Sequence, residues 1–235
     1  MADQPLFLAS SSPRRRQLLA AAGIAFEPLV APVDEEALTA DYRGPLGQLG
    51  EFLARAKALA ARNVLRAGGR TGLVLASDTT VLLDGRSLPK PRDLEEAERM
   101  LRTLRAREHV VATGVALLDT SSDAVRSGAS ATRVLMRDYG DPEIAAYVAS
   151  GDPLDKAGAY SIQHPTFHPV ADIRGCHLGV IGLPVCLVAA MLSRGPLPPV
   201  SAASGDGRCI WSQRCTPPLP GPKRIHGAMT NEDGL

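Results

Sequence analysis

The sequence predicts a fold of mixed α/β order, and three observations support that prediction. Apolar segments of strand length alternate with longer segments whose apolar residues recur at helical spacing. Serine, glycine and proline mark the boundaries between these segments. The chain has 235 residues, of which 45% are hydrophobic and 22% are charged, so it can bury a core of ordinary size.

The first elements are a strand, a polar turn and a helix. Pro5 to Ala9 is an apolar run, and the polar turn that ends in Ser12 and Pro13 follows it directly. Because Ser12 is a natural N-cap and Pro13 suits the first helical position, a helix begins there and ends before Gly23. We therefore expect the free N–H groups of a helix start to lie beside the end of a strand.

The next part predicts a second strand, an acidic loop and one long helix. The strand covers Ala25 to Val30, and the loop holds Asp34-Glu35-Glu36. The helix runs from about Pro45 to Arg66, because its apolar residues recur three and four positions apart. Lys57 lies at the edge of that apolar stripe, where its side chain can reach a cleft.

A third strand, Leu73 to Ala76, is expected to lead into the polar residues Ser77 to Thr80. The apolar residues Val81 to Leu83 and a turn at Asp84-Gly85 follow. Asp78 would then stand just after a strand, where α/β sheets commonly present functional groups.

The second half continues the alternation. In order, it predicts a helix from Leu94 to Arg105 capped by Asp93, an antiparallel pair of strands at Val110–Leu118 and Ala131–Met136, a helix from Asp141-Pro142 to just before Gly151, loops and short strands between Asp155 and Gly179, and a closing helix at Leu183–Leu192.

Domain organisation follows from the same pattern. Residues 1–194 form one domain, and residues 195–235 are a tail rich in proline and glycine that we expect to be disordered.

The charge balance excludes some functions. Lys and Arg total 26 and Asp and Glu total 25, so no net basic field favours nucleic acid or a membrane surface. No segment approaches the length needed to span a bilayer, and we expect a cytoplasmic protein. The sequence also lacks the phosphate-loop, dinucleotide-binding and nucleophile-elbow motifs.

Ser10, Arg14 and Arg15 are candidates for binding an anion. They lie at the strand-to-helix turn, where free backbone N–H groups and the helix dipole attract negative charge. Arginines there add charge-assisted hydrogen bonds to phosphate oxygens. The competing interpretation is a solvated basic face of the helix.

Four further residues are candidates for the chemistry. The carboxylates of Asp78 and Glu35 can bind a divalent cation or accept a proton, and the ammonium groups of Lys57 and Lys90 can neutralise phosphate. For Asp78 the alternative is a turn or N-cap residue. The five histidines have no metal-binding spacing, and we expect them in loops: His109, His164, His168, His177 and His226.

Seven segments taken together carry more information than any one of them. They are Leu8–Arg15 with Leu18-Leu19, Ala54–Ala58, Ala76–Thr79, Lys90–Arg92, Ala112–Ala116, Asp155–Gln163 and Gly179–Pro184. In this order, the set resembles the Maf family of nucleotide pyrophosphatases across about residues 5–193. The resemblance implies an α/β fold with a mixed central sheet, flanking helices and two lobes around a deep cleft.

The resemblance also implies an activity, which is hydrolysis of a nucleoside triphosphate to the monophosphate and pyrophosphate with a divalent cation, Mg²⁺ or Mn²⁺. It places Asp78 as the proton acceptor, with Arg15, Lys57 and Lys90 as fixed positive charge. Metal ligands would be Asp78 and Glu35, with Glu36 as the alternative to Glu35. Ser10 would bind substrate, and a homodimer is an assembly to test.

The resemblance divides into branches that differ in the base they accept. Arg14, Thr79 and Gln163 match the branch that acts on dTTP and UTP, with modified pyrimidine nucleotides as a further class. The alternatives are a 7-methyl-GTP pyrophosphatase and a nucleotide-binding regulator of cell division and septum formation.

Overall fold

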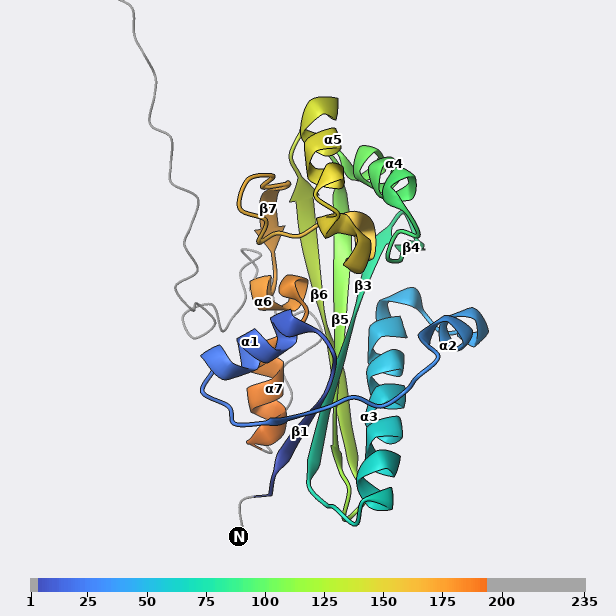
Figure 1. The fold of residues 1–235 in the computed structure, drawn as a ribbon, viewed down its shortest axis with the longest axis vertical. Helices are drawn as coiled ribbons and strands as arrows, with labels where there is room; N and C mark the ends of the chain where they lie inside the picture. The colour runs from blue at the N-terminus through green and yellow to red at the C-terminus, as the bar shows by residue number, and fades with distance from the viewer. Residues whose placement is uncertain (1–3, 194–235) are drawn as a thin grey trace, which may run out of the picture.

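The computed structural model describes residues 4–193 (Figure 1). Its strands are β1 (Leu6–Ala9), β2 (Glu27–Leu29), β3 (Leu73–Leu83), β4 (Arg86–Leu88), β5 (Glu108–Asp119), β6 (Val125–Met136) and β7 (Val170–Arg174). Its α-helices are α1 (Pro13–Ala21), α2 (Glu35–Asp41), α3 (Leu49–Ala67), α4 (Leu94–Leu104), α5 (Asp141–Ala149), α6 (His177–Ile181) and α7 (Val185–Leu192). Three short 3₁₀ helices are η1 (Leu46–Gln48), η2 (Asp152–Asp155) and η3 (Ala157–Ala159).

One mixed sheet organises this part of the chain. Its strand order is β2-β1-β3-β5-β6-β7, and β4 pairs with β3 off this path. β1 lies parallel to both β2 and β3, whereas the pairs from β3 through β5 and β6 to β7 are antiparallel. The predicted mixed sheet with flanking helices is therefore confirmed, while its division into two lobes remains a prediction.

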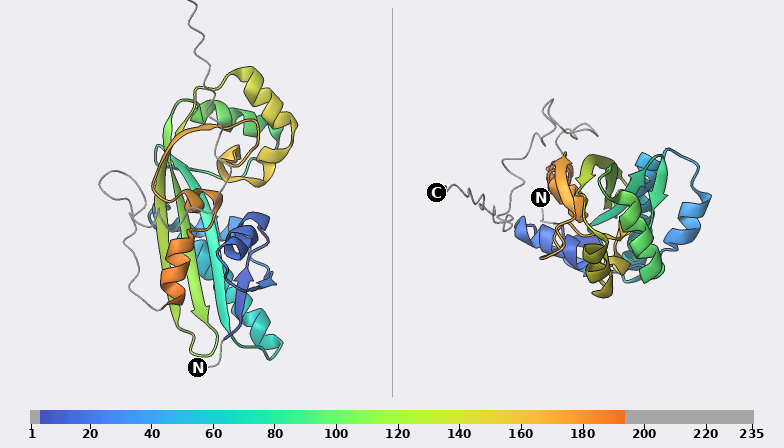
Figure 2. Two further views of the ribbon diagram at one scale, coloured as in Figure 1. Left: turned by 90° about the vertical axis from the view of Figure 1, so that its left-hand side faces the viewer. Right: turned by 90° about the horizontal axis from the view of Figure 1, so that it is seen from above.

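The helices cover the sheet in three groups. Because successive side chains of a strand point to opposite faces, Val74 and Ala76 pack against α3 while Leu75 packs with α1 and α7 on the other face. Further along β3, Val81 and Leu83 join a third cluster with α4 and α5. Figures 1 and 2 show α4 and α5 gathered at one end of the sheet.

The structure corrects the expected break in β3. The sequence predicts a strand that stops at Ala76, but β3 continues to Leu83, with 11 residues in all, and Ser77, Asp78 and Thr79 lie in its middle. Pairing with β5 satisfies their backbone, with Asp78 opposite Gly114. Asp78 is therefore a mid-strand residue at the junction between core clusters, and not a residue at a strand end.

The acidic loop is a second correction, because Glu35 and Glu36 begin helix α2. The carboxylate of Asp34 caps it by accepting from the N–H of Ala37 at 2.9 Å. Acidic residues after such a cap are favoured by the helix dipole, so the segment carried a helix-start signal. The sequence prediction also missed β4, and it did not resolve β7 or α6 within the segment assigned to loops and short strands.

Most other elements are confirmed. Ser12 caps α1, Asp93 caps α4, and β5 and β6 form the expected antiparallel pair. The long helix has a 3₁₀ turn before α3 begins at Leu49. The tail after residue 194 lies outside the described residues. Among helices within 4–193, none combines the length and apolar character needed to cross a bilayer.

Two glycines allow α3 to lie directly on the sheet. A Cβ on Gly114 of β5 would stand 2.1 Å from the backbone nitrogen of Glu51, and one on Gly50 would stand 2.9 Å from the carbonyl oxygen of Asp78. Neither obstacle is a flexible side chain. The absence of a Cβ at both positions therefore fixes the distance between α3 and β3, and with it the height of Lys57 above Asp78.

Replacing Gly114 by alanine should separate the helix from the sheet. We expect Gly114→Ala to lower the free energy of unfolding by about 3 kcal/mol, as overpacking against an immovable neighbour does. Chemical denaturation measures this effect. Gly128→Ala on neighbouring β6 is the matched control, because its Cβ would meet only side-chain atoms of Leu187 and Met191, at 3.7 Å or more. Equal stability of the two variants would contradict the tight α3 contact.

Candidate functional site

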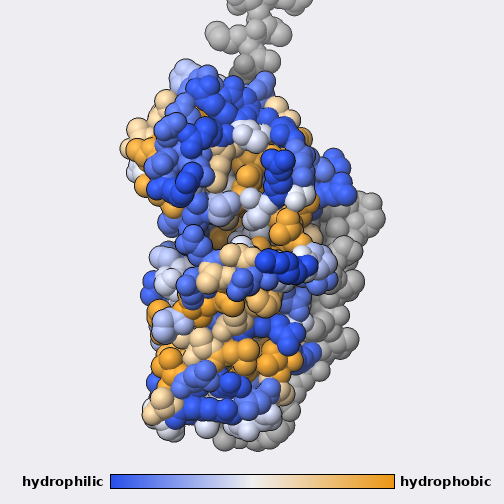
Figure 3. Space-filling view, turned by 90° about the vertical axis from the view of Figure 1, so that its right-hand side faces the viewer, coloured by the Kyte–Doolittle hydropathy of each residue, from blue (hydrophilic) through white to orange (hydrophobic). Residues whose placement is uncertain are grey.

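A pocket of about 1040 Å³ opens across the middle of the described chain. In the space-filling view the surface is hollowed there (Figure 3). Residues from the β1–α1 turn, α2, α3, the middle of β3, the segment after β4, residues 155–163 and the end of α6 line it. All nine residues predicted from the sequence lie on its wall: Ser10, Arg14, Arg15, Glu35, Lys57, Asp78, Thr79, Lys90 and Gln163.

Lys57 joins the two predicted carboxylates at one side of the pocket. Its Nζ lies 2.5 Å from Asp78 Oδ1 and 3.0 Å from Glu35 Oε2. The side chains of Lys57 and Asp78 are only 13% and 11% exposed, whereas that of Glu35 is 49% exposed. One ammonium between two carboxylates leaves a net negative charge, so this corner attracts a cation.

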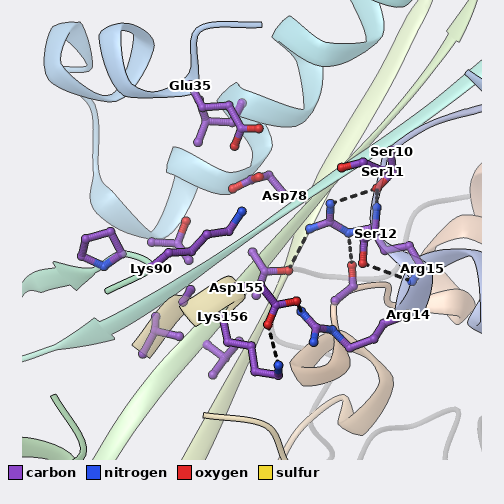
Figure 4. Close-up of a pocket in the computed structure, with 18 of the residues that line it drawn as sticks. Ser10, Ser11, Ser12, Arg14, Arg15, Glu35, Asp78, Lys90, Asp155 and Lys156 are labelled. Carbon is purple, nitrogen blue, oxygen red and sulfur yellow. Dashed lines mark hydrogen bonds and ion pairs between the residues drawn. The ribbon is translucent and has the colours of Figure 1, made fainter. Parts of the chain in front are cut away.

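Arg15, on the part of the pocket wall that α1 contributes, is held in a fixed orientation. Its Nε donates to the carbonyl of Gly182 at 2.9 Å, and its two terminal nitrogens donate to Ser10 Oγ at 3.3 Å and Thr79 Oγ1 at 3.4 Å (Figure 4). Burial lowers the pKa of Arg15, while the charges of Asp78 and Glu35 raise it. These contacts use three of the five N–H groups of a guanidinium, and the other two remain for a ligand.

The turn before α1 completes an anion-binding surface. The hydroxyl of Ser12 accepts from the backbone N–H of Arg15 at 3.5 Å, and Ser12 N–H donates to Ser10 Oγ at 3.1 Å. Ser10, Ser11 and Ser12 all line the pocket. Because a helix N-terminus carries partial positive charge, this wall suits phosphate oxygens.

Sequence reasoning did not single out Asp155 and Lys156, which lie on the facing wall. Arg14 Nη2 is 3.6 Å from Asp155 Oδ2, and Lys156 Nζ is 2.5 Å from Asp155 Oδ1 and 2.9 Å from Asp152 Oδ1. Lys156 is 7% exposed. In the sequence both residues belong to Asp155–Gln163, one of the seven segments described above, but neither spacing nor periodicity assigned them a role.

Lys90 and Gln163 occupy the other parts of the wall. Lys90 follows β4, and Figure 4 shows its ammonium end directed to the same side of the pocket as Asp78. Gln163 is exposed, and only its backbone N–H is engaged, with Ser161 Oγ at 3.2 Å. Gln163 is thus an exposed residue of the pocket wall.

His109 corrects the expectation that all histidines lie in loops. It belongs to β5, is 3% exposed, and its Nε2 lies 2.7 Å from the hydroxyl oxygen of Tyr160, a residue of the pocket wall. Burial lowers the pKa of His109 to about 4. His177 begins α6, whereas His164 and His168 do lie outside helices and strands, and His226 lies beyond the described range.

The donors present fit a hard divalent cation that shares its ligands with substrate. Within residues 4–193, no group of three or more His, Cys, Asp or Glu side chains forms a metal cage. Glu35 and Asp78 nevertheless converge around Lys57 Nζ. Enzymes usually bind Mg²⁺ through one or two carboxylates, and the phosphates of the substrate supply further ligands.

Comparison with known proteins gives consistent results. Residues 5–195 match the family model described as "Maf-like protein". A protein of Pelotomaculum thermopropionicum named dTTP/UTP pyrophosphatase is 41% identical over 189 residues, which cover 80% of this chain and 95% of that protein. Proteins with the same name from Geotalea uraniireducens and Thermomicrobium roseum are 43% and 44% identical, each over 82% of this chain, and 96% and 85% of their own lengths are covered.

The buried histidine predicts a specific pH dependence of stability. Below pH 6.5 the unfolded chain protonates His109 while the folded protein does not, down to the folded pKa of about 4. Stability therefore falls as the pH falls through this window, by about 2 kcal/mol between pH 7 and pH 5 from this group.

We expect His109→Gln to lose this part of the pH dependence, as measured by denaturant unfolding at both pH values. Tyr160→Phe is the control, because it removes the hydroxyl partner but keeps the buried imidazole and hence the effect. A Gln variant with the wild-type pH dependence would contradict the assignment.

Proposed function

Because the chain belongs to the Maf-like protein family, we propose that it hydrolyses dTTP and UTP to the nucleoside monophosphate and pyrophosphate. The observation that carries the proposal is the fixed pair of Asp78 and Lys57 in a pocket whose wall also holds Arg15 and Lys90. A base and several cations in one enclosed site are what hydrolysis of a polyanion requires.

The first task of the site is to hold the triphosphate. The positive end of the α1 dipole, the two remaining N–H groups of Arg15 and the ammonium of Lys90 offer positive charge from two walls. Arg14 forms an ion pair with Asp155, and its own side chain is 28% exposed. A phosphate can therefore replace that carboxylate at the guanidinium. The triphosphate would then lie across the pocket above the middle of β3.

The second task is to activate water. Asp78 is a fixed acceptor, because its backbone is part of the sheet and Lys57 Nζ holds one carboxylate oxygen. Water attacks the α-phosphorus, and a new P–O bond forms while one proton of the water passes to Asp78. The bond between the α-phosphorus and the oxygen that bridges to the β-phosphate breaks, and pyrophosphate leaves. The cations of the pocket stabilise the leaving pyrophosphate.

A divalent cation, Mg²⁺ or Mn²⁺, forms part of the proposal. Glu35 and Asp78 would hold it, since both carboxylates already converge, and Glu36 also lines the pocket. When bound, it supplies further neutralisation of the phosphate charge. Lys57 Nζ contacts both carboxylates and so orients them toward each other.

The preference for pyrimidines rests on Gln163 within this proposal. A uracil or thymine edge offers an N3–H donor flanked by carbonyl acceptors, and an amide side chain can accept from the first and donate to the second. Gln163 is exposed and lines the pocket. Thr79, by contrast, directs its hydroxyl to Arg15 and Thr113, so it acts on the site from behind.

The activity is tested with Asp78→Asn. We expect release of pyrophosphate from dTTP to fall by about a hundredfold to ten-thousandfold, because the amide cannot accept the proton. Coupled detection of pyrophosphate measures kcat, and circular dichroism checks the fold. Asp172→Asn is the control and should keep wild-type rates, because Asp172 lies in the edge strand β7, where its carboxylate forms an ion pair with Arg174. An Asp78→Asn variant within twofold of wild type would refute the role.

Base selectivity is tested with Gln163→Glu. The carboxylate keeps the acceptor but loses the donor, so kcat/KM for dTTP relative to 7-methyl-GTP should fall by about tenfold to a hundredfold. Gln17→Glu, an exposed change of the same kind on α1, should leave the ratio unchanged. A wild-type preference for 7-methyl-GTP, or a constant ratio in Gln163→Glu, would exclude Gln163 as the base-reading residue.

A further inference from the structure

We propose that Thr113 is a positioning residue that fixes the hydroxyl of Thr79 and, through it, the guanidinium of Arg15. This inference rests on the proposed function, because it concerns how the phosphate-binding arginine is held. Thr113 lies on β5, opposite Thr79 on β3, and has 0% exposure. It does not line the pocket, so it acts only through its neighbours.

The distances fix the direction of every hydrogen bond in this group. Thr113 Oγ1 lies 2.7 Å from the carbonyl oxygen of Gly179 and 3.1 Å from Thr79 Oγ1. A carbonyl can only accept, so the single hydroxyl proton of Thr113 is donated to Gly179. The contact between the two hydroxyls must then be a donation from Thr79 to Thr113.

The same reasoning determines what Thr79 offers to Arg15. Its proton is committed to Thr113, so its oxygen faces Arg15 Nη2 as an acceptor at 3.4 Å. A guanidinium has only donors, so it requires that the oxygen of Thr79 accept. The hydrogen bonds therefore run in one direction, from Arg15 through Thr79 and Thr113 to the carbonyl of Gly179. We call this series of hydrogen bonds the Arg15 relay, or simply the relay.

Both ends of this arrangement lead to the same short segment. The Nε of Arg15 donates to the carbonyl of Gly182 at 2.9 Å, while the relay ends on Gly179, three residues earlier. The hydroxyl of Ser77 also contacts the carbonyl of Gly182, at 3.0 Å. Arg15 is thus fastened to the α6 region by one direct bond and one relayed bond, which together define the plane of its guanidinium.

Loss of the Thr113 hydroxyl would release the proton of Thr79. That proton would lose its acceptor on Thr113, and if it turned towards Arg15 it would face another hydrogen-bond donor. Arg15 would keep its hydrogen bonds to Gly182 and Ser10 but lose the acceptor that fixes the position of its Nη2. Since positioning errors reduce the rate of reaction more than ground-state binding, kcat should change more than KM.

The test compares Thr113→Val, which is nearly isosteric but lacks the hydroxyl, with Thr113→Ser, which retains it. We expect Thr113→Val to lower kcat for dTTP about tenfold with KM within about threefold of wild type. Thr113→Ser should return kcat to within about threefold of wild type. A serine variant as impaired as the valine variant would overturn the relay.

Thr132→Val is the matched control. Thr132 lies on adjacent β6, is 1% exposed, and its hydroxyl accepts from the N–H of Cys176 at 3.0 Å and contacts the carbonyl of Cys176 at 3.3 Å. It loses the same group next to the same helix without touching the Arg15 relay. We expect its kcat within twofold of wild type, even where its stability falls as much as that of Thr113→Val.

A double-mutant cycle shows whether Thr113 acts through Thr79. If it does, Thr79→Val combined with Thr113→Val should be no slower than Thr79→Val alone, because the relay is already broken. Rate losses that multiply independently would overturn the inference. So would equal kinetics of the Thr113→Val and Thr132→Val variants.

Failure of the proposed function would be recognised separately, from absent pyrophosphate release by wild-type protein. In that case the NMR resonance of the Arg15 Nε–H group in the protein alone replaces turnover as the readout. Thr113→Val should shift or broaden this resonance while Thr132→Val leaves it in place, and an unchanged resonance in Thr113→Val would overturn the relay.

Discussion

The contact between α3 and the sheet at Gly50 and Gly114 is the constraint on which the rest of the site depends. Backbone meets backbone there, and no side chain can adjust the distance. Two helical turns further on, Lys57 therefore reaches Asp78 at 2.5 Å while its stem stays on the apolar side of α3. Glu35 joins the pair only because α2 lies against α3. The placement of α2 and α3 therefore determines whether these three charged groups can meet.

Polar residues in the middle of a central strand cost stability unless each one is satisfied, and here each has a partner. Ser77 contacts the carbonyls of Gly114 and Gly182, Thr79 is bound by Arg15 and Thr113, and Asp78 is bound by Lys57. They lie where β3 passes from the clusters beside α3 and α7 to the cluster under α4. The site thereby occupies the gap between cores and interrupts none of them.

Local sequence signals predicted the elements well where caps and periodicity are strong. Ser12 and Pro13 predicted the start of α1, and the apolar run Leu73–Ala76 predicted the first part of β3. The apolar run ends before Ser77–Thr80, because hydroxyl and carboxylate side chains look like a turn until the partner strand that pairs with them is known. His109 was misjudged for a similar reason, since only tertiary packing buries it against Tyr160. The gathering of all nine site residues around one pocket followed from family resemblance, because no local rule relates Arg15 to Gly182, 167 positions away.

The unbroken ladder between β3 and β5 limits how the molecule can move. Residues from Leu73 to Leu82 pair in register with residues from Asp119 to Val110, on both sides of Asp78. A hinge at the floor of the pocket would have to break the hydrogen bonds between β3 and β5, so we expect the floor to be rigid. Any closure around a ligand must then come from the neighbouring segments of the wall, namely α2 with Glu35 and the segment from Asp155 to Gln163. These walls can tighten while the aspartate beneath them stays in place.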